Sequence, residues 1–404
     1  MTRRLVVCCD GTWNFADQAT AGRPSPTNVT KIALSVAPED PEGAEQRVYY
    51  HCGVGTARWE RLRGGAFGFG LAGNVFDAYH FLIDNYHAGD DLFLFGFSRG
   101  AYTARSLAGL IRNCGILRRE NADRLQDAWE LYRNSAEKPS GVASALFRQA
   151  YSHDPRIRFL GMFDTVGALG VPAMGPRWLR PLVRRLDRRW EFHDTRLSSR
   201  VDGAFQALAI DERREAFEPA LWHQKPGVDG QEMKQVWFSG AHSDVGGGYP
   251  DASLSDIVLL WMADRARAYG LRFQPGAFGP DGPAEMAPGQ STLFRVAPNM
   301  MARPHDSLTR FYRLMAPVDR PIGKCADRRS RRLDGNEYVA STAKEHFEAD
   351  PTYRPPQLAE YLRLDGRLEP VAGTADGTVG RAKKAGLRGE GLPAAARSHR
   401  HRGR

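Results

Sequence analysis

The sequence predicts an α/β fold built on a doubly wound, mostly parallel sheet. Short, wholly apolar runs recur along the first 240 residues, which is typical of strands buried on both faces. Stretches with apolar residues at helical spacing separate these runs, and strand–helix–strand order favours parallel pairing. Polar or glycine-rich loops follow several of the strands, at the sheet edge where such folds place their chemistry.

The predicted strands and helices alternate along the chain. Strands are expected at residues 4–9, 46–51, 92–95, 157–163, 204–210 and 235–238. Helices are expected at residues 30–36, 75–86, 101–111, 123–150 (with an interruption near Pro139) and 253–268. From about residue 270 Pro and Gly become frequent, and irregular structure packed against the core is expected there.

Composition divides the chain into three parts. Residues 1–270 are expected to form the main domain, 271–370 an irregular extension packed on it, and 371–404 a disordered basic tail. From Arg381 to the end there are eight Lys or Arg and one Glu, which is +7 of the net charge of +9. The rest of the chain is nearly neutral, which argues against a dedicated nucleic-acid enzyme.

The cysteines and the N-terminus bear on location. The five cysteines form no C-x-x-C pair, which fits a reducing cytosol better than a disulfide framework. No run of about 18 apolar residues occurs, so no membrane-spanning helix is predicted. Asp10 interrupts the apolar start, which is therefore interpreted as a strand and not a signal peptide. A cytoplasmic protein is expected, and a signal-independent export route fits the sequence equally well.

The most informative stretch lies at residues 91–111, DLFLFGFSRGAYTARSLAGLI. An apolar strand leads into Gly96-Phe97-Ser98-Arg99-Gly100, which matches G-x-S-x-G, and a helix rich in small residues follows. Strand, sharp turn and helix in this order are the context that a nucleophile elbow requires. The pattern predicts that the Ser98 hydroxyl is the nucleophile of an acyl-transfer reaction; the alternative is a structural turn serine.

A nucleophilic serine requires a base and a carboxylate that orients the base. His242 follows an apolar strand and opens a glycine-rich loop, so it is the first candidate for the base. Asp164 ends the strand after the elbow and is the first candidate for the acid. Asp244 with His305 is the rival pair, because it also keeps the order Ser, Asp, His.

An oxyanion hole for ester hydrolysis is expected beside the elbow. The backbone amide of Arg99, directly after the nucleophile, is one predicted donor, and Gly11 or Thr12 after the first strand is the second. Asp10 is expected to brace this loop by accepting backbone or hydroxyl hydrogen bonds. A weaker alternative is a divalent cation held by Asp10 and Asp244, although no metal or cofactor is predicted.

A basic amphipathic segment follows the predicted acid. In residues 177–190, RWLRPLVRRLDRRW, two Trp and two Leu recur at four-residue steps among six Arg. Such a helix suits an anionic membrane surface, and it lies where a lid insertion, residues 172–200, would cover the pocket. The alternative is a helix packed on the core with its arginines in solvent.

A set of motifs spread over residues 4–265 resembles a known family. DGTWN, GVGT, GFSRGAYTARSLAG, FDTVGALG, ALAIDERREAFEP and GAHSDVGGGY, with HDS at 305–307, are similar to the type VI secretion phospholipase effector-like catalytic domains. The resemblance implies an α/β-hydrolase fold, a phospholipid substrate and the triad Ser98, Asp164 and His242. It also implies a secretion-system or immunity partner if the protein is an effector.

The sequence therefore predicts a serine hydrolase of carboxylic esters, most simply an A-type phospholipase or a lysophospholipase. The alternative is a catalytically idle scaffold that binds a membrane or a protein partner through its basic segments. Nucleotide binding is disfavoured, because the elbow lacks the G-x-G-x-x-G spacing.

Overall fold

The computed structural model describes residues 2–11, 14, 19–20, 23–53, 67–134, 136–167, 197–223, 228, 230–278, 296–308, 317–323 and 336–372. Its centre is an eight-stranded sheet with the strand order β12-β11-β10-β9-β8-β5-β1-β4. Every neighbouring pair in this sheet is parallel. The predicted α/β class with a parallel sheet is confirmed.

The strands of the central sheet are β1 (Arg4–Cys9), β4 (Gln46–His51), β5 (Asp91–Phe97), β8 (Ile157–Phe163), β9 (Val201–Ala209), β10 (Glu232–Phe238), β11 (Glu337–Ala340) and β12 (Leu368–Glu369). Two strand pairs lie outside it, β2 (Ala19–Thr20) with β3 (Arg23–Pro24), and β6 (Ile116–Leu117) with β7 (Ser152–His153). The α-helices are α1 (Asn28–Ser35), α2 (Phe67–Asn85), α3 (Ser98–Cys114), α4 (Leu125–Arg133), α5 (Val142–Tyr151), α7 (His242–Gly246), α8 (Ser253–Ala268), α10 (Ser341–Ala349) and α11 (Pro356–Arg363). Two 3₁₀ helices, η2 (Arg119–Arg124) and η4 (Glu215–Phe217), complete the described elements.

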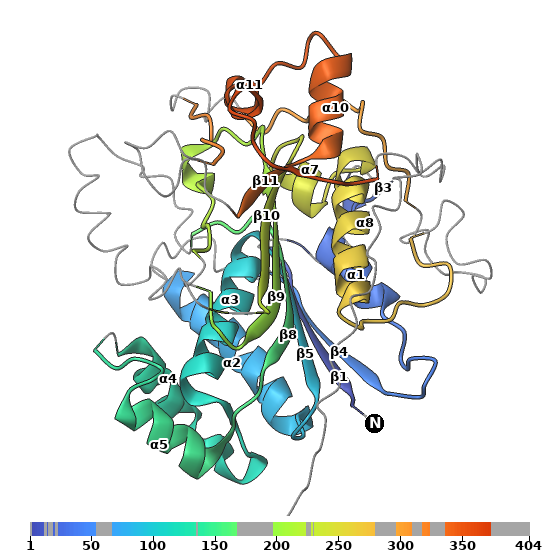
Figure 1. Cartoon of the computed structure of the whole chain (residues 1–404). Coiled ribbons are helices and arrows are strands. Elements are labelled where there is room, and N and C mark those ends of the chain that lie inside the picture. Colours follow the sequence, from blue (N-terminus) through green and yellow to red (C-terminus); the bar gives the residue numbers. More distant parts are fainter. Residues whose placement is uncertain are drawn as a thin grey trace, which may run out of the picture.

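Helices cover both faces of the sheet, as Figure 1 shows with α2 and α3 on one side and α1 and α8 on the other. Side chains of a strand alternate between these two layers. In β1, Leu5 and Val7 join the core beneath α2 and α3, whereas Val6 and Cys8 join the core beneath α1 and α8. Burial of both faces is why the strands read as continuous apolar runs.

The connections create a switch point at β1. The chain passes from β1 to its neighbour β4, and then returns to β5 on the opposite side of β1. From β5 onward, the sheet grows outward in chain order through β8, β9, β10, β11 and β12. In open parallel sheets the crevice beyond the carboxyl ends of the strands at such a switch point is where ligands bind. Here the residues at that point are Asp10 and Ser98.

Several elements lie within the predicted bounds, and others differ. β1, β4, β8 and α8 have the predicted ends. α1 begins at Asn28, earlier than predicted, because the Thr27 side chain caps it by accepting a hydrogen bond from the Thr30 amide. The expected irregular structure of residues 271–370 is corrected in part. β11 and β12 extend the central sheet there, and α10 and α11 accompany them.

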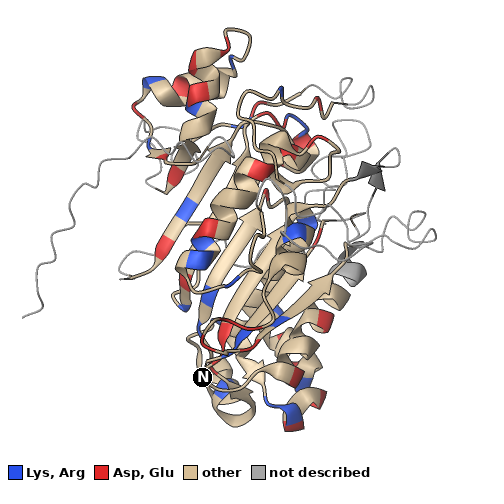
Figure 2. Ribbon diagram, turned by 90° about the vertical axis from the view of Figure 1, so that its right-hand side faces the viewer, with Lys and Arg blue, Asp and Glu red and all other residues tan. Residues whose placement is uncertain are grey.

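Charged residues of both signs are interspersed along the described ribbon in the view of Figure 2. This distribution fits the nearly neutral charge counted for the chain before its basic tail. Among the described helices, none combines the length and the apolarity needed to span a bilayer. The arginine-rich segment 177–190 and the lid range 172–196 lie outside the described residues, as does the tail from residue 373.

Candidate active site

The turn between β5 and α3 has the geometry of a nucleophile elbow. Ser98, the first residue of α3, has a φ of 57°, in the left-handed region that non-glycine residues seldom occupy. A Cβ at Gly96 would lie 2.5 Å from the Cα of Ala101, and one at Gly100 would lie 2.2 Å from the last carbonyl oxygen of β1. Both flanking glycines are therefore required by the close approach of backbone.

Asp164 lies beside this turn on the neighbouring strand. Phe97 and Phe163 are register partners in β5 and β8, so Ser98 and Asp164 are the next residues on the two strands. Asp164 is fully buried and also has a positive φ, 39°. Its Oδ1 accepts a hydrogen bond from the Ala209 amide at 3.1 Å, which fixes the carboxylate against the end of β9.

His242 begins α7, just beyond β10, and its ring reaches the same edge of the sheet. The Nδ1 of His242 donates to Oδ2 of Asp164 at 2.6 Å. The ring packs against Phe97, with centroids 4.6 Å apart, and against Phe217 at 4.8 Å. Because Nδ1 is engaged by the carboxylate, Nε2 is the ring nitrogen that this arrangement offers to a nucleophile.

The structure adds Arg320, which the sequence analysis did not consider. Its Nη1 donates to Oδ1 of Asp164 at 2.7 Å, and its Nη2 donates to Oδ2 at 3.1 Å. Burial acts to raise the pKa of Asp164, but the charges and hydrogen bonds of Arg320 and His242 outweigh it and lower that pKa to about 2. The Asp164 carboxylate is thus ionised at neutral pH.

The rival pair is also formed. His305 Nδ1 donates to Oδ1 of Asp244 at 2.6 Å, and Oδ2 of Asp244 accepts the His305 and Ala241 amides at 2.9 Å each. The His305 ring stacks on Tyr249, with centroids 4.1 Å apart. The two histidines differ in exposure, since the His305 side chain is 34% exposed and that of His242 is 6% exposed.

Glu212, a fully buried residue, links the two Asp–His pairs. Its carboxylate accepts the His242 amide at 3.3 Å and the Ser307 hydroxyl at 3.1 Å. Arg214 donates to both of its oxygens through Nε and Nη2. Although burial acts to raise the pKa of Glu212, Arg214 holds it below its usual value. Glu212 and Arg214 both lie in the motif ALAIDERREAFEP, but the motif alone assigns Glu212 no role, because His242 and Ser307 lie far away along the chain.

Asp10 has the bracing role that the sequence predicts. Oδ2 accepts hydrogen bonds from the hydroxyls of Thr27, Thr30 and Tyr50 at 2.6, 2.9 and 2.8 Å, and Oδ1 accepts the Gly11 amide at 2.7 Å. Burial still raises the pKa of this carboxyl above its ordinary value. The side chain therefore ties the end of β1 to the start of α1 and to β4.

The three predicted oxyanion donors, Gly11, Thr12 and Arg99, differ in their surroundings and in whether the structure describes them. The Gly11 amide is engaged by Asp10, so the hydrogen that an oxyanion would need already has an acceptor. Thr12 lies outside the described residues. Arg99 is the second residue of α3, so its amide belongs to the first turn of that helix. Burial lowers the pKa of the Arg99 guanidinium to about 10.

A divalent cation at Asp10 and Asp244, the weaker alternative from the sequence, would have to bind two carboxylates that already accept hydrogen bonds. Asp10 accepts four hydrogen bonds, and Asp244 accepts three. Within the described ranges, no group of three or more His, Cys, Asp or Glu is arranged to hold a metal ion. Both carboxylates therefore act as hydrogen-bond acceptors that hold neighbouring segments of the chain together.

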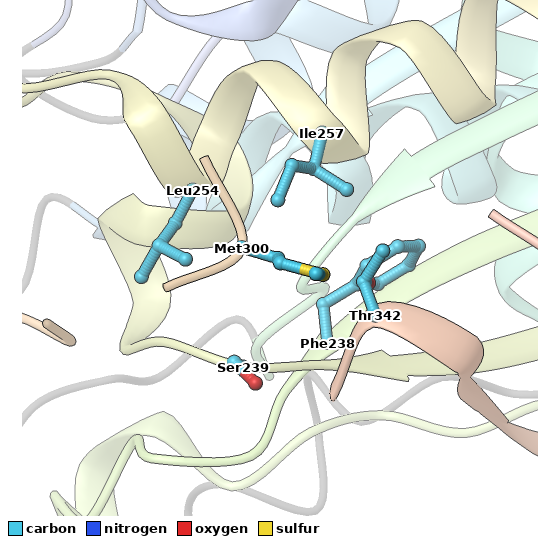
Figure 3. A pocket seen from close by; sticks show the side chains of 6 residues that line it. All are labelled: Phe238, Ser239, Leu254, Ile257, Met300 and Thr342. Carbon is cyan, nitrogen blue, oxygen red and sulfur yellow. The ribbon is translucent and has the colours of Figure 1, made fainter. Parts of the chain in front are cut away.

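A small pocket lies beyond the end of β10, between α8 and the start of α10. Its empty volume is about 200 Å³, and Figure 3 shows Met300 pointing toward Phe238 inside it. The lining residues are Phe238, Ser239, Leu254, Ile257, Met300 and Thr342. None of these belongs to either Asp–His pair or to the elbow.

Residues 3–265 match the family described as type VI secretion system phospholipase effector Tle1-like, catalytic domain. This match spans well over half of the chain. The chain belongs to this family. The Tle1-like match contains the elbow, Asp164 and His242, whereas Arg320 and His305 lie beyond its end.

Individual relatives are more distant. An uncharacterized protein of Saccharomyces cerevisiae is 28% identical over 252 residues, which cover 56% of this chain and 33% of the yeast protein. A crystal structure of an uncharacterized protein from Pseudomonas aeruginosa aligns with a TM-score of 0.42 at 19% identity, over 73% of this chain and 49% of that chain. The structure of the Tle1 effector bound to the VgrG spike of the type 6 secretion system aligns with a TM-score of 0.33 at 19% identity, over 61% and 51%. This chain thus spans about a third to a half of the length of these proteins.

Proposed function

We propose that this Tle1-like protein is a serine hydrolase of carboxylic esters, with Ser98 as nucleophile, His242 as base and Asp164 as orienting acid. The observation that carries the proposal is the register of β5 and β8. It sets the strained Ser98 turn beside the carboxylate that holds His242. Family membership implies a lipase or phospholipase activity, and we propose an A-type phospholipase or lysophospholipase.

The proposed reaction follows from these positions. His242 Nε2 takes the proton of the Ser98 hydroxyl as Oγ attacks the acyl carbonyl, and the imidazolium then protonates the leaving alcohol. Water, activated by the same imidazole, releases the fatty acid from the acyl-enzyme. Asp164, whose Oδ2 lies 2.6 Å from Nδ1, orients the imidazole and stabilises the imidazolium without taking its proton.

The His242 pair is preferred over the His305 pair for a geometric reason. The His242 ring packs on Phe97, the residue directly before Ser98, and Asp164 follows the register partner of Phe97. His305 instead stacks on Tyr249 and pairs with Asp244, which lies two residues after His242 in α7. We assign His305 and Asp244 a supporting role at the rim of the site.

The oxyanion is proposed to bind the Arg99 amide at the start of α3, where the helix dipole also favours negative charge. Thr12 is the proposed second donor, since the Gly11 amide already donates to Asp10. Residues 177–190 are proposed to contact the membrane surface, within a lid of residues 172–200. A cytoplasmic location before export, and a secretion-system or immunity partner, are proposed from the family alone.

The test uses phospholipid vesicles and two serine variants of the same helix. Wild type should release fatty acid, and Ser98→Ala should lower the rate by at least roughly 10³-fold with the fold unchanged by circular dichroism. Ser106→Ala, about two turns further along α3, should retain the wild-type rate. Equal measurable rates for wild type and Ser98→Ala would refute Ser98 as the nucleophile. A wild type that binds vesicles without turnover would favour the idle scaffold.

A further inference from the structure

A segment outside the family match enters the site. Residues 317–323 lie more than 50 residues beyond the end of the match at residue 265. Arg320, in the middle of this segment, is only 4% exposed. Its guanidinium contacts both oxygens of Asp164, at 2.7 and 3.1 Å, in the bidentate geometry that suits a carboxylate.

The same guanidinium also fixes the backbone on two sides of the carboxylate. Nη1 donates to the Ala209 carbonyl at 3.0 Å, and Nη2 donates to the Phe217 carbonyl. Ala209 is the last residue of β9, and its amide in turn donates to Asp164. The Phe217 ring packs against His242 at 4.8 Å. One buried cation therefore joins the acid, its strand neighbour and the residue that supports the base.

We infer that Arg320 is a positioning residue of the catalytic acid, which fixes the Asp164 carboxylate and limits the charge that this carboxylate presents to His242. The inference rests on the proposed function, because it assigns Arg320 a role only in a triad that contains Asp164 and His242. It also extends the working site beyond residue 265.

The electrostatic consequence has a definite sign. Asp164 is shared between the permanent charge of Arg320 and the imidazolium that forms when His242 takes a proton. The Arg320 charge opposes formation of that imidazolium, because the two cations share one carboxylate. Removal of the charge leaves Asp164 to stabilise the imidazolium alone. The acid limb of the kcat/KM profile should then move to higher pH.

The other charged groups around His242 are paired and stay in place. Glu212 accepts its backbone amide and is held by Arg214, whose guanidinium lies over the Phe217 ring. On α7 itself, Asp244 is engaged by His305. A substitution at Arg320 therefore changes the charge on the Asp164 side of the ring and leaves these partners present.

A matched control variant separates the positioning of Asp164 by Arg320 from the mere attachment of residues 317–323 to the rest of the protein. Arg213 and Asp319 form an exposed ion pair, with 2.9 Å between Nε and Oδ1, that joins the same two parts of the chain. Neither residue contacts Asp164 in a described hydrogen bond or ion pair. Arg213→Gln should therefore loosen the attachment slightly and leave the pH profile unchanged.

The experiment measures kcat and KM against pH on a soluble short-chain ester for wild type, Arg320→Gln, Arg320→Lys and Arg213→Gln. Arg320→Gln should lower kcat by roughly 10- to 100-fold and leave KM within about twofold. It should also move the acid limb of the kcat/KM profile to higher pH. Arg320→Lys keeps the charge but loses the bidentate contact, so kcat should fall about tenfold while the acid limb stays in place. An unmoved acid limb in Arg320→Gln, or a wild-type kcat in Arg320→Lys, would overturn the inference.

A second measurement needs no turnover. Histidine ¹⁵N resonances are titrated in wild type and in Arg320→Gln, with His242 assigned by the signal lost in His242→Gln. The His242 midpoint should be higher in Arg320→Gln, and an unchanged midpoint would contradict the inference even if the fold is intact. An inactive wild type whose His242 midpoint still responds to Arg320 would refute the proposed function and leave the electrostatic coupling standing.

Discussion

Replacement of Asp164 by Asn should destabilise the fold in a pH-dependent manner. Its pKa, lowered from 3.8 to about 2, corresponds to about 2 kcal/mol of stabilisation at neutral pH. Asp164→Asn also leaves the buried Arg320 without a charged partner, so a total loss of about 3 kcal/mol at pH 7 is expected. Because the native pKa lies below the unfolded value, this stabilisation is complete above about pH 4 and is lost as the pH falls toward 2.

The assay is urea unfolding of wild type and Asp164→Asn between pH 7 and pH 3. The difference in unfolding free energy should stay near its full value down to pH 5 and shrink by about 1 kcal/mol at pH 3. Asp202→Asn is the control, because Asp202 also accepts from two arginines but lies at the surface, where about 1 kcal/mol or less is expected. A difference for Asp164→Asn that does not change with pH would refute the reasoning.

Two further pairs of substitutions test the elbow and the choice of base. Gly100→Ala places a Cβ against the backbone of β1 and should prevent stable folding, whereas Gly73→Ala, with nothing within 4 Å of its Cβ, should keep or slightly raise the melting temperature. Equal melting temperatures for the two variants would contradict the claim that position 100 requires glycine. His242→Gln should lower ester turnover by roughly 10³-fold or more, and His305→Gln by less than about tenfold. The reverse order would assign catalysis to the Asp244 pair.

The parts of the fold that were predictable carry their signal locally. The β1 and β8 runs are largely apolar on both faces, and their bounds follow from the sequence alone, whereas β5 was predicted at residues 92–95 and extends from Asp91 to Phe97. β11 has only four residues, EYVA, and β12 has two. Segments this short have no detectable periodicity. β11 becomes a strand because it pairs with the edge of β10, and β12 pairs in turn with β11.

The residues of the candidate site divide in the same way, into those with a local sequence signal and those whose contacts join distant parts of the chain. Ser98 and Asp10 were found from local patterns, a G-x-S-x-G turn and a carboxylate at the end of the first strand. Tyr50 completes the Asp10 network from another strand, and Arg320 reaches Asp164 across 156 residues of sequence. A single arginine in VDRPIG carries no local sign of such a contact, since the contact exists only after the chain has folded.

The most direct test of the proposed nucleophile is covalent labelling with a fluorophosphonate probe. The purified wild-type protein should be labelled at Ser98, as identified by mass spectrometry of the modified peptide, and labelling should be lost in Ser98→Ala and strongly slowed in His242→Gln. A folded wild-type protein that the probe does not modify, or that it modifies at another serine, would contradict the assignment of Ser98, His242 and Asp164 as a catalytic triad.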